Sequence, residues 1–274
     1  MPGLTLRYEL EEVAPGGRIG LIALATDYNS ETDLRRMLPA GVELFTNRAL
    51  NANPVTVENL RAMSGDITRA AAGILPDHGV DVMIYGCTSG TAAIGEDRLE
   101  ALIHEAQPGV ACTNPVAAVE AALRASGTQR ISILTPYTRS VNDLLAAEFR
   151  ERGFEILNID GFGLDRDIDM TGLPVAVIEE AARQIRHPDA EALFISCTAI
   201  RAAQAVEALE RDLDIPVVTS NQALVWHSLR LMENGSPVTG FGRLFGLRME
   251  GEPGETSPRS SLNGQRPKNG RFRR

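Results

Sequence analysis

Short apolar runs alternate along the chain with longer segments in which apolar residues recur at helical spacing. In the first half the apolar runs cover residues 19–25, 42–45, 80–85 and 110–112. Continuous apolar runs of this length, separated by helices, are typical of strands in a parallel sheet. We expect helices at 56–73, 98–105, 115–126, 173–185, 199–212 and 222–234. The pattern therefore predicts an α/β fold.

The two halves of the chain repeat each other at a separation of about 110 residues. Residues 18–26 match 130–138, and residues 81–88 match 191–198. Two shorter matches join 41–44 to 153–156 and 110–114 to 217–221. Four matches in the same order indicate a duplication. We therefore predict two pseudo-symmetric flavodoxin-like lobes, each with a four-stranded parallel sheet.

The repeat also suggests where each lobe begins and ends. We expect lobe 1 to cover residues 1–113 and to be completed by 225–249, and lobe 2 to cover 114–224. After residue 255 the chain carries five Arg, one Lys and no acidic residue. We predict that 250–274 is a disordered basic tail, because it lacks the apolar residues that would form a core.

Each lobe carries a Cys-Thr pair directly after its third apolar run, Cys87-Thr88 in the first lobe and Cys197-Thr198 in the second. Ligands of doubly wound sheets bind beyond the carboxyl ends of the strands. We therefore expect both thiols to face one active site in the cleft between the lobes. The recurrence at equivalent positions favours this role over the alternative, in which both cysteines are small buried hydrophobic residues.

Two thiols on opposite sides of a bound substrate are suited to proton transfer at carbon. A thiolate removes a proton from one face and a thiol returns one to the other, which inverts the configuration without a redox cofactor. We expect a helix after each Cys-Thr pair to stabilise the thiolate. The hydroxyl groups of Thr88, Ser89 and Thr198 are candidates for binding a substrate carboxylate.

Other polar positions are interpreted structurally. Cys112 matches Thr219 of the second half and lies within an apolar run, so it is expected in the core. Asn114 and Asn221 precede helical segments and are expected to be N-caps. The three cysteines and four histidines show no spacing typical of a disulfide framework or a metal site.

Composition excludes several classes of function. The chain carries 36 acidic and 27 basic residues and a formal net charge of −9, which disfavours nucleic acid and anionic membranes as partners. Its single lysine, Lys268, lies in the predicted tail, which excludes lysine-bound pyridoxal phosphate and a P-loop. No apolar run approaches the roughly 18 residues of a membrane span, and no secretory signal is recognised. We expect a cytoplasmic protein that uses neither a cofactor nor a metal.

The paired motifs Cys87-Thr88-Ser89-Gly90 and Cys197-Thr198 resemble those of the aspartate/glutamate racemase superfamily. Within it, the chain is most similar to the branch of maleate cis-trans isomerase, arylmalonate decarboxylase and the EutA proteins of ectoine utilisation, and to EutA above all. The resemblance implies two lobes around a cofactor-free active site and, by analogy, a homodimer. Decarboxylases of this branch keep only the second cysteine, so two cysteines favour isomerisation or racemisation.

The resemblance also implies roles for three further residues. Tyr137 matches a tyrosine that helps maleate isomerases to bind their diacid, whereas Asp27 and Asp167 stand where those enzymes have asparagines. Two carboxylates would repel a dianion and attract an ammonium group, as the amine substrates of the EutA group would require. In the alternative interpretation Asp27 or Asp167 caps a helix or lies in a solvated loop, and Asp165 and Asp169 are further candidates for the second position.

Three hypotheses follow. The leading one is a racemase or isomerase that acts beside the carboxylate of a small amino or hydroxy-amino acid in ectoine or hydroxyectoine utilisation, with Cys87 and Cys197 as the acid/base pair. The second is a maleate-type cis-trans isomerase in which a cysteine, by analogy Cys87, adds to the double bond. The third is a non-catalytic protein that binds a small molecule between its lobes.

Overall fold

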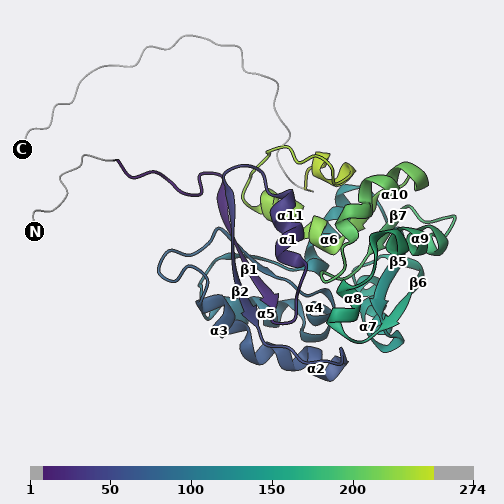
Figure 1. Ribbon diagram of the computed structural model, residues 1–274, viewed down its shortest axis with the longest axis horizontal. Helices are drawn as coiled ribbons and strands as arrows, with labels where there is room; N and C mark the ends of the chain where they lie inside the picture. The colour runs from purple at the N-terminus through teal and green to yellow at the C-terminus, as the bar shows by residue number, and fades with distance from the viewer. Residues whose placement is uncertain (1–8, 250–274) are drawn as a thin grey trace, which may run out of the picture.

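Two parallel sheets of four strands each form the framework of the molecule (Figure 1). The computed structural model describes residues 9–249. The first sheet has the order β2-β1-β3-β4 and the second has the order β6-β5-β7-β8. The strands are β1 (Gly17–Leu24), β2 (Val42–Ala49), β3 (Val82–Tyr85), β4 (Ala111–Thr113), β5 (Arg130–Tyr137), β6 (Glu155–Leu164), β7 (Ala192–Ile195) and β8 (Val217–Thr219). The shared order confirms the predicted fold class and the duplication.

Helices connect the strands and cover the sheets. In the first half they are α1 (Ser30–Met37), α2 (Val57–Ala62), α3 (Ile67–Ala72), α4 (Thr88–Ile94), α5 (Glu96–His104) and α6 (Pro115–Ala125). In the second half they are α7 (Arg139–Glu151), α8 (Asp167–Thr171), α9 (Val175–Ile185), α10 (Val206–Leu213) and α11 (Ser220–Leu231). Short 3₁₀ turns lie at η1 (Met63–Asp66), η2 (Ala202–Ala205) and η3 (Arg243–Gly246).

Two predicted helices are divided or displaced in the structure. The helix expected at 56–73 is interrupted by η1, which contains the poor helix formers Ser64 and Gly65. The Ser64 hydroxyl donates to the carbonyl of Arg61 at 2.9 Å, a bond that competes with the helical pattern. The helix expected at 199–212 begins later, because the residues after Cys197 form bends and then η2.

One of the two predicted N-caps is confirmed. The side chain of Asn114 caps α6 by accepting the amide protons of Val116 and Ala117. The prediction for Asn221 is wrong, because α11 begins earlier and its cap is Thr219, which forms a capping box with the third helical residue.

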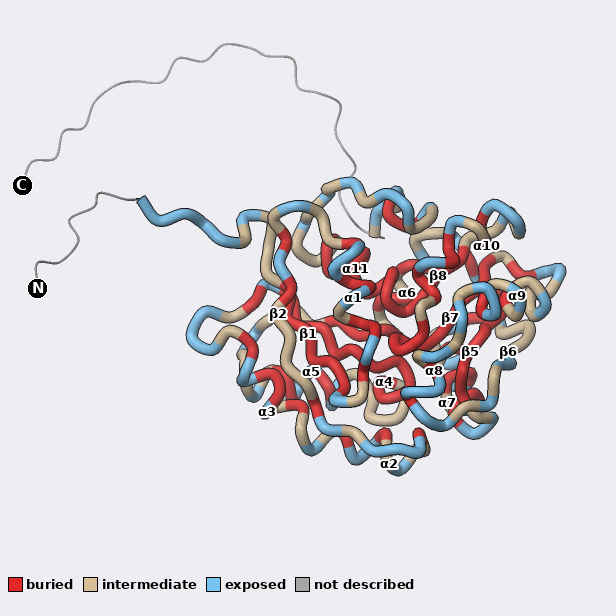
Figure 2. The backbone as a smooth tube through the Cα atoms, in the orientation of Figure 1, coloured by how far each residue is buried: buried red, intermediate tan, exposed pale blue. Residues whose placement is uncertain are grey.

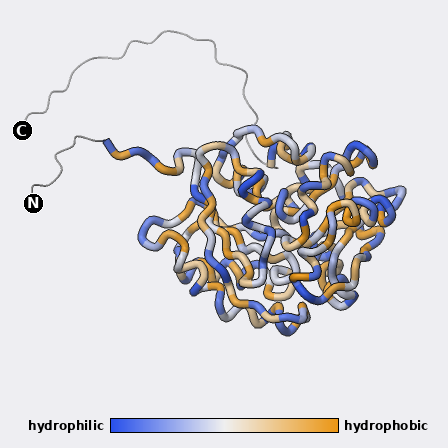
Figure 3. Tube along the Cα trace, viewed as in Figure 1, coloured by the Kyte–Doolittle hydropathy of each residue, from blue (hydrophilic) through white to orange (hydrophobic). Residues whose placement is uncertain are grey.

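The core lies along the central strands of both sheets. All four residues of β3 and all four of β7 are buried, and β1 and β5 are buried along most of their length. Of these strands, β1, β5 and β7 are labelled and largely red in Figure 2, and orange hydrophobic segments run through the interior in Figure 3. Burial on both faces explains the continuous apolar runs. Cys112 is only half-buried, so its predicted core position holds in part. Its strand, β4, is one of the two edge strands of the sheet.

The last helix joins the two lobes. Helix α11 packs against α1 and α6, and the segment after it contacts residues of both halves of the chain: Asn234 donates to the Gly16 carbonyl, and the amide of Arg243 donates to Glu210. The proposed limits of the lobes remain predictions. The predicted tail lies outside the described residues. Between residues 9 and 249 no helix has the length and apolar character needed to cross a membrane.

Truncation of a central core side chain is expected to destabilise the fold strongly. Phe194 is fully buried on β7, and its ring centroid lies 5.3 Å from that of Phe149. Phe194→Ala should lower the free energy of unfolding by about 3–5 kcal/mol. Urea unfolding followed by the fluorescence of Trp226, the single tryptophan, measures this loss. Val177→Ala, at a position that is 43 % exposed, is the control and should change stability little; equal losses would contradict the expectation.

Candidate active site

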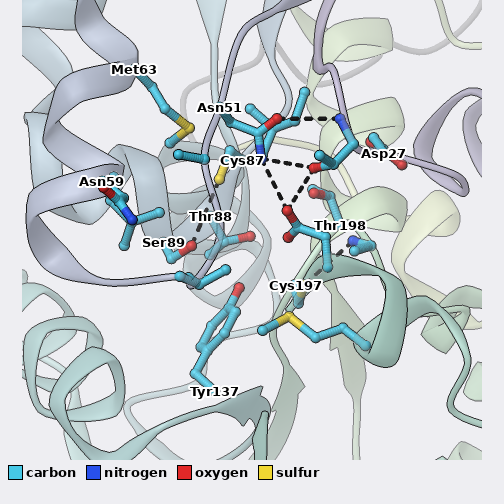
Figure 4. A pocket seen from close by; sticks show the side chains of 18 residues that line it. Asp27, Asn51, Asn59, Met63, Cys87, Thr88, Ser89, Tyr137, Cys197 and Thr198 are labelled. Carbon is cyan, nitrogen blue, oxygen red and sulfur yellow. Dashed lines mark hydrogen bonds between the residues drawn. The ribbon is translucent and has the colours of Figure 1, made fainter. Parts of the chain in front are cut away.

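A pocket lies where the carboxyl ends of the two sheets face each other. All eight residues that the sequence analysis selected line it: Asp27, Cys87, Thr88, Ser89, Tyr137, Asp167, Cys197 and Thr198. Figure 4 labels seven of them, all except Asp167, around the pocket and shows the Tyr137 hydroxyl directed into it. Residues more than 100 positions apart in the sequence thus meet in one small space.

Cys87 lies between β3 and α4 and is the N-cap of that helix. A helix close to this cysteine was expected, but the capping role was not. Its Sγ accepts a hydrogen bond from the amide of Gly90 at 3.2 Å and lies 3.7 Å from the Ser89 hydroxyl oxygen. A Cβ at position 90 would lie 3.0 Å from this sulfur and 2.6 Å from the Tyr85 hydroxyl oxygen, so only glycine allows the close approach of the backbone.

Cys197 occupies the equivalent position after β7, but its surroundings differ. No helix begins there, so the expectation that a helix stabilises both thiolates is wrong for this cysteine. Its backbone has a φ of 99°, which places it outside the usual range of L-residues. Its Sγ accepts a bond from the amide of Ala199 at 3.4 Å, and its interaction with the Tyr137 hydroxyl lowers its pKa.

Burial dominates the electrostatics of both thiols. It raises the pKa of Cys87 to about 12, although the Gly90 amide and the Ser89 hydroxyl each lower the pKa in part. Burial likewise raises the pKa of Cys197 to about 12, against the Tyr137 hydroxyl and the Ala199 amide. Both cysteines are therefore neutral thiols at pH 7 in the unliganded protein.

The two carboxylate oxygens of Asp27 differ: one is held in structural hydrogen bonds and the other has no partner among the described residues. Its Oδ1 accepts the amide protons of Asn29 at 2.7 Å and Ser30 at 2.9 Å, which orients the start of α1. Its Oδ2 is buried and accepts no hydrogen bond from the described residues. Burial raises the pKa of this carboxyl above its usual range, although the bonds from Ser30 and Asn29 oppose the shift. The side chain thus anchors a helix and still has a free acceptor.

Asp167 begins α8 and links the two lobes. Its Oδ2 accepts the Thr26 hydroxyl at 2.6 Å and the Asn51 side-chain amide at 3.0 Å. The competing candidates Asp165 and Asp169 are exposed and do not line the pocket. Of the three carboxylates in this segment, Asp167 is the one placed to meet a ligand.

Two of the predicted carboxylate-binding hydroxyls also bridge the lobes. Thr198 donates to the carbonyl of Gly86 at 3.0 Å, and the Thr88 and Ser220 hydroxyl oxygens are 2.9 Å apart. Among residues 9–249, the Ser89 hydroxyl has only the weak contact with Cys87. The amides of Thr88 and Ser89 lie in the first turn of α4, where no intrahelical carbonyl is available. These groups are the donors best placed for a ligand carboxylate.

The sequence analysis missed part of the lining. It contains the polar residues Thr26, Asn51 and Asn59 and several apolar ones, among them Val55, Leu60, Met63 and Met170. Asn51 follows β2, which pairs with β1, so its position beyond the carboxyl end of a strand was an available signal. Among the described residues, no cluster of His, Cys, Asp or Glu is arranged to hold a metal ion.

Comparison with known proteins places this site in a family. The sequence pattern of the family described as arylmalonate decarboxylase matches residues 19–245. The chain belongs to the arylmalonate decarboxylase family. A member of this family is an enzyme, so the hypothesis of a non-catalytic binding protein is set aside.

Individual relatives of this arylmalonate decarboxylase family member include isomerases. The maleate isomerase of Nocardia farcinica is 27 % identical over 240 residues, which cover 83 % of this chain and 95 % of that protein. The arylmalonate decarboxylase of Bordetella bronchiseptica is 34 % identical over 146 residues, which cover 50 % and 58 % of the two chains. A solved structure of a cysteine-to-serine mutant of the Nocardia farcinica maleate cis-trans isomerase contains a covalently bound succinylcysteine intermediate. It matches this chain with a TM-score of 0.77 and 25 % identity, and the match covers 83 % of this chain and 97 % of that one.

Loss of the Tyr137 hydroxyl is expected to affect one cysteine selectively. Because that hydroxyl lowers the pKa of Cys197, Tyr137→Phe should raise it further and reduce alkylation of Cys197 by iodoacetamide at pH 8 by about tenfold. Peptide mass spectrometry gives the rate at each cysteine, with Cys87 in the same molecule as the reference. Equal changes at both cysteines would show that the substitution alters the pocket in general.

Proposed function

We propose that this enzyme racemises or isomerises a small carboxylic acid that also carries an amino group, with Cys87 and Cys197 as an acid/base pair. One observation carries the proposal: two thiols from equivalent positions of duplicated lobes line one pocket, and the charged side chains in its lining are two carboxylates, Asp27 and Asp167. This combination favours a ligand that brings its own positive charge.

The two ends of such a ligand meet different walls of the pocket. A carboxylate is accommodated by the Ser89 hydroxyl and by the first-turn amides of α4, which would also stabilise the negative charge that develops on proton removal. An ammonium group is accommodated by the unpartnered Oδ2 of Asp27 and by Asp167. The carbon between these groups would then lie beside the cysteines.

The chemical step requires only proton transfers. The thiolate of one cysteine takes the proton of the carbon next to the carboxylate, so that an S–H bond forms and the C–H electron pair is delocalised into the carboxylate. The thiol of the other cysteine gives its proton to the opposite face of this carbon. The product has the inverted configuration, and the two cysteines have exchanged protonation states.

Substrate charge would help to form the thiolate. Asp167 and Asp27 raise the pKa of Cys87, and Asp167 also raises that of Cys197. A bound ammonium group would offset these negative charges and lower the pKa of both thiols from the high values in the unliganded protein. A dianion would act in the opposite sense.

We further propose a substrate of the diaminobutyrate type, as occurs in ectoine and hydroxyectoine utilisation. The resemblance to the EutA group and the two carboxylates of the pocket support this choice. A substrate with two amino groups and one carboxylate would match Asp27 and Asp167 in number and charge.

A second candidate is a maleate-type cis-trans isomerase. It is supported by the succinylcysteine of the Nocardia farcinica relative, which indicates that one cysteine of that enzyme adds covalently to its ligand. In this route Cys87 would add to the double bond, the central bond would rotate, and the thiolate would leave again. Two acidic residues in the lining count against maleate.

The two candidates give different products in one pair of experiments. Incubation with diaminobutyrate-type amino acids in D₂O should remove the α-proton signal from the NMR spectrum, and Cys87→Ser and Cys197→Ser should each slow this exchange by about 10²–10⁴-fold. Intact-protein mass spectrometry after mixing with maleate should show no adduct. A succinyl adduct without any α-proton exchange would establish the second candidate instead.

Ionisation of Asp27 should make the stability of the fold depend on pH. Because the folded-state pKa is raised, the folded protein binds this proton more tightly than the unfolded chain does. Wild-type stability should therefore fall as the pH rises from about 3.9, the unfolded value, through the folded-state pKa. Asp27→Asn lacks this loss, so its melting temperature relative to that of the wild type should increase as the pH rises over this range. Glu43→Gln, at an exposed position of β2, is the control, and its difference in melting temperature from the wild type should stay constant.

A further inference from the structure

Cys197 is held in a backbone conformation that costs free energy. Its φ of 99° is one that side-chain-bearing residues rarely adopt, whereas Cys87, its counterpart in the other lobe, has an extended φ of −146° and ψ of 116°. Strained residues persist only where the surrounding structure imposes the conformation, and they cluster at functional sites. The groups that impose it on Cys197 can be read from its hydrogen bonds.

The backbone groups on either side of the Cys197-Thr198 peptide bond are hydrogen-bonded to buried side chains. The amide of Cys197 donates to the Ser220 hydroxyl at 3.1 Å. The carbonyl of Thr198 accepts the side-chain amides of Asn221 at 2.9 Å and Asn29 at 3.1 Å. We call Asn29, Asp33, Ser220 and Asn221 the clamp.

Asp33 orients the two amides of the clamp. Its side chain is 1 % exposed, and its Oδ2 accepts Asn29 Nδ2 at 2.9 Å and Asn221 Nδ2 at 3.2 Å. Because this carboxylate oxygen accepts both bonds, it selects the rotamer of each amide that presents its nitrogen. The same nitrogens then face the Thr198 carbonyl. Arg36, whose Nη1 is 4.0 Å from Asp33 Oδ1, is the cation that offsets the charge.

The clamp connects elements from the two lobes. Asp33 belongs to α1 and Asn29 precedes it, both in the first half of the chain, whereas Ser220 and Asn221 begin α11. The Ser220 hydroxyl also meets that of Thr88, beside Cys87. None of the four clamp residues lines the pocket. Lobe 1 thus contributes to the geometry of the lobe 2 cysteine without contacting the ligand.

We propose that Asp33, Ser220 and Asn221 are positioning residues that hold Cys197 in its left-handed conformation and so direct its thiol into the pocket. The importance of this thiol for catalysis rests on the proposed function, but its conformation does not. A test based on backbone strain therefore separates a failure of this inference from a failure of the proposed reaction.

Glycine and alanine at the two cysteine positions measure the strain. Glycine adopts a φ of 99° freely, so Cys197→Gly should melt at a higher temperature than Cys197→Ala. At the extended Cys87 the order should be reversed, because glycine there only adds freedom to the unfolded chain. Differential scanning calorimetry of the four full-length variants gives both differences. Cys197→Ala melting as high as Cys197→Gly would overturn the inference.

The clamp is tested by repeating the position 197 comparison in variant backgrounds. In Asn221→Ala and in Asp33→Asn the backbone is free to relax, so the advantage of Cys197→Gly over Cys197→Ala in melting temperature should shrink to less than half. Asn142→Ala, which removes another buried and hydrogen-bonded asparagine of lobe 2, should leave the advantage unchanged. An undiminished advantage in both clamp variants would refute the proposal. Where either fails to fold, Ser220→Ala, which removes the bond to the Cys197 amide together with the contact to the Thr88 hydroxyl, provides the same comparison.

A second readout concerns the thiol itself. In Asp33→Asn and Ser220→Ala with both cysteines present, the rate of iodoacetamide alkylation at Cys197 should change severalfold relative to the rate at Cys87. A purely structural role would change both rates alike, and that result would count against positioning. If the α-proton exchange is observed, its kcat should fall in these variants with little change in KM, because no clamp residue contacts the ligand.

Discussion

Removal of two thiols from water is the constraint on which this active site depends. Each sulfur lies at the carboxyl end of a buried central strand, where the two sheets face each other, and each has a pKa raised to about 12 by that burial. A thiolate in this position is costly unless donors and positive charge are supplied. The amides of Gly90 and Ala199 and the Tyr137 hydroxyl supply part of this stabilisation. The remainder, on our proposal, comes from the substrate.

The duplicated lobes solve this problem in different ways. In lobe 1 the cysteine caps a helix with ordinary backbone geometry, and a glycine three residues later brings an amide to the sulfur. In lobe 2 the helix is absent, the backbone is strained, and a tyrosine hydroxyl takes the place of helix donors. The two thiols are therefore related by the fold but differ in chemical environment, which suits a site in which one removes a proton and the other returns it.

The carboxylates stabilise the architecture and, on our proposal, two of them also bind the ligand. Asp27 anchors the start of α1 through one oxygen and leaves the other buried without a partner among the described residues. Asp167 binds two lobe 1 side chains across the pocket. Asp33 is withdrawn from the pocket and orients the amides that hold the Cys197-Thr198 peptide. Two of these buried acidic residues, Asp27 and Asp167, line the pocket, whereas Asp33 does not.

Much of the fold followed from local pattern, as did the two cysteines and the hydroxyl residues beside them. Asp27, Tyr137 and Asp167 were expected only from the resemblance to a known family. Strands that are buried on both faces consist of continuous apolar residues, which predicted four strands in each lobe. The duplication leaves a repeat in the sequence, which predicted a Cys-Thr pair at the carboxyl end of one strand in each lobe. Proximity across the lobes was not. The unpartnered oxygen of Asp27, the bridging by Thr198, the bonds of Asn221 and the left-handed Cys197 depend on how the two lobes pack. Hydrophobic periodicity records which face of an element is buried, but it carries no information about which distant polar group a side chain meets; only the tertiary structure decides that.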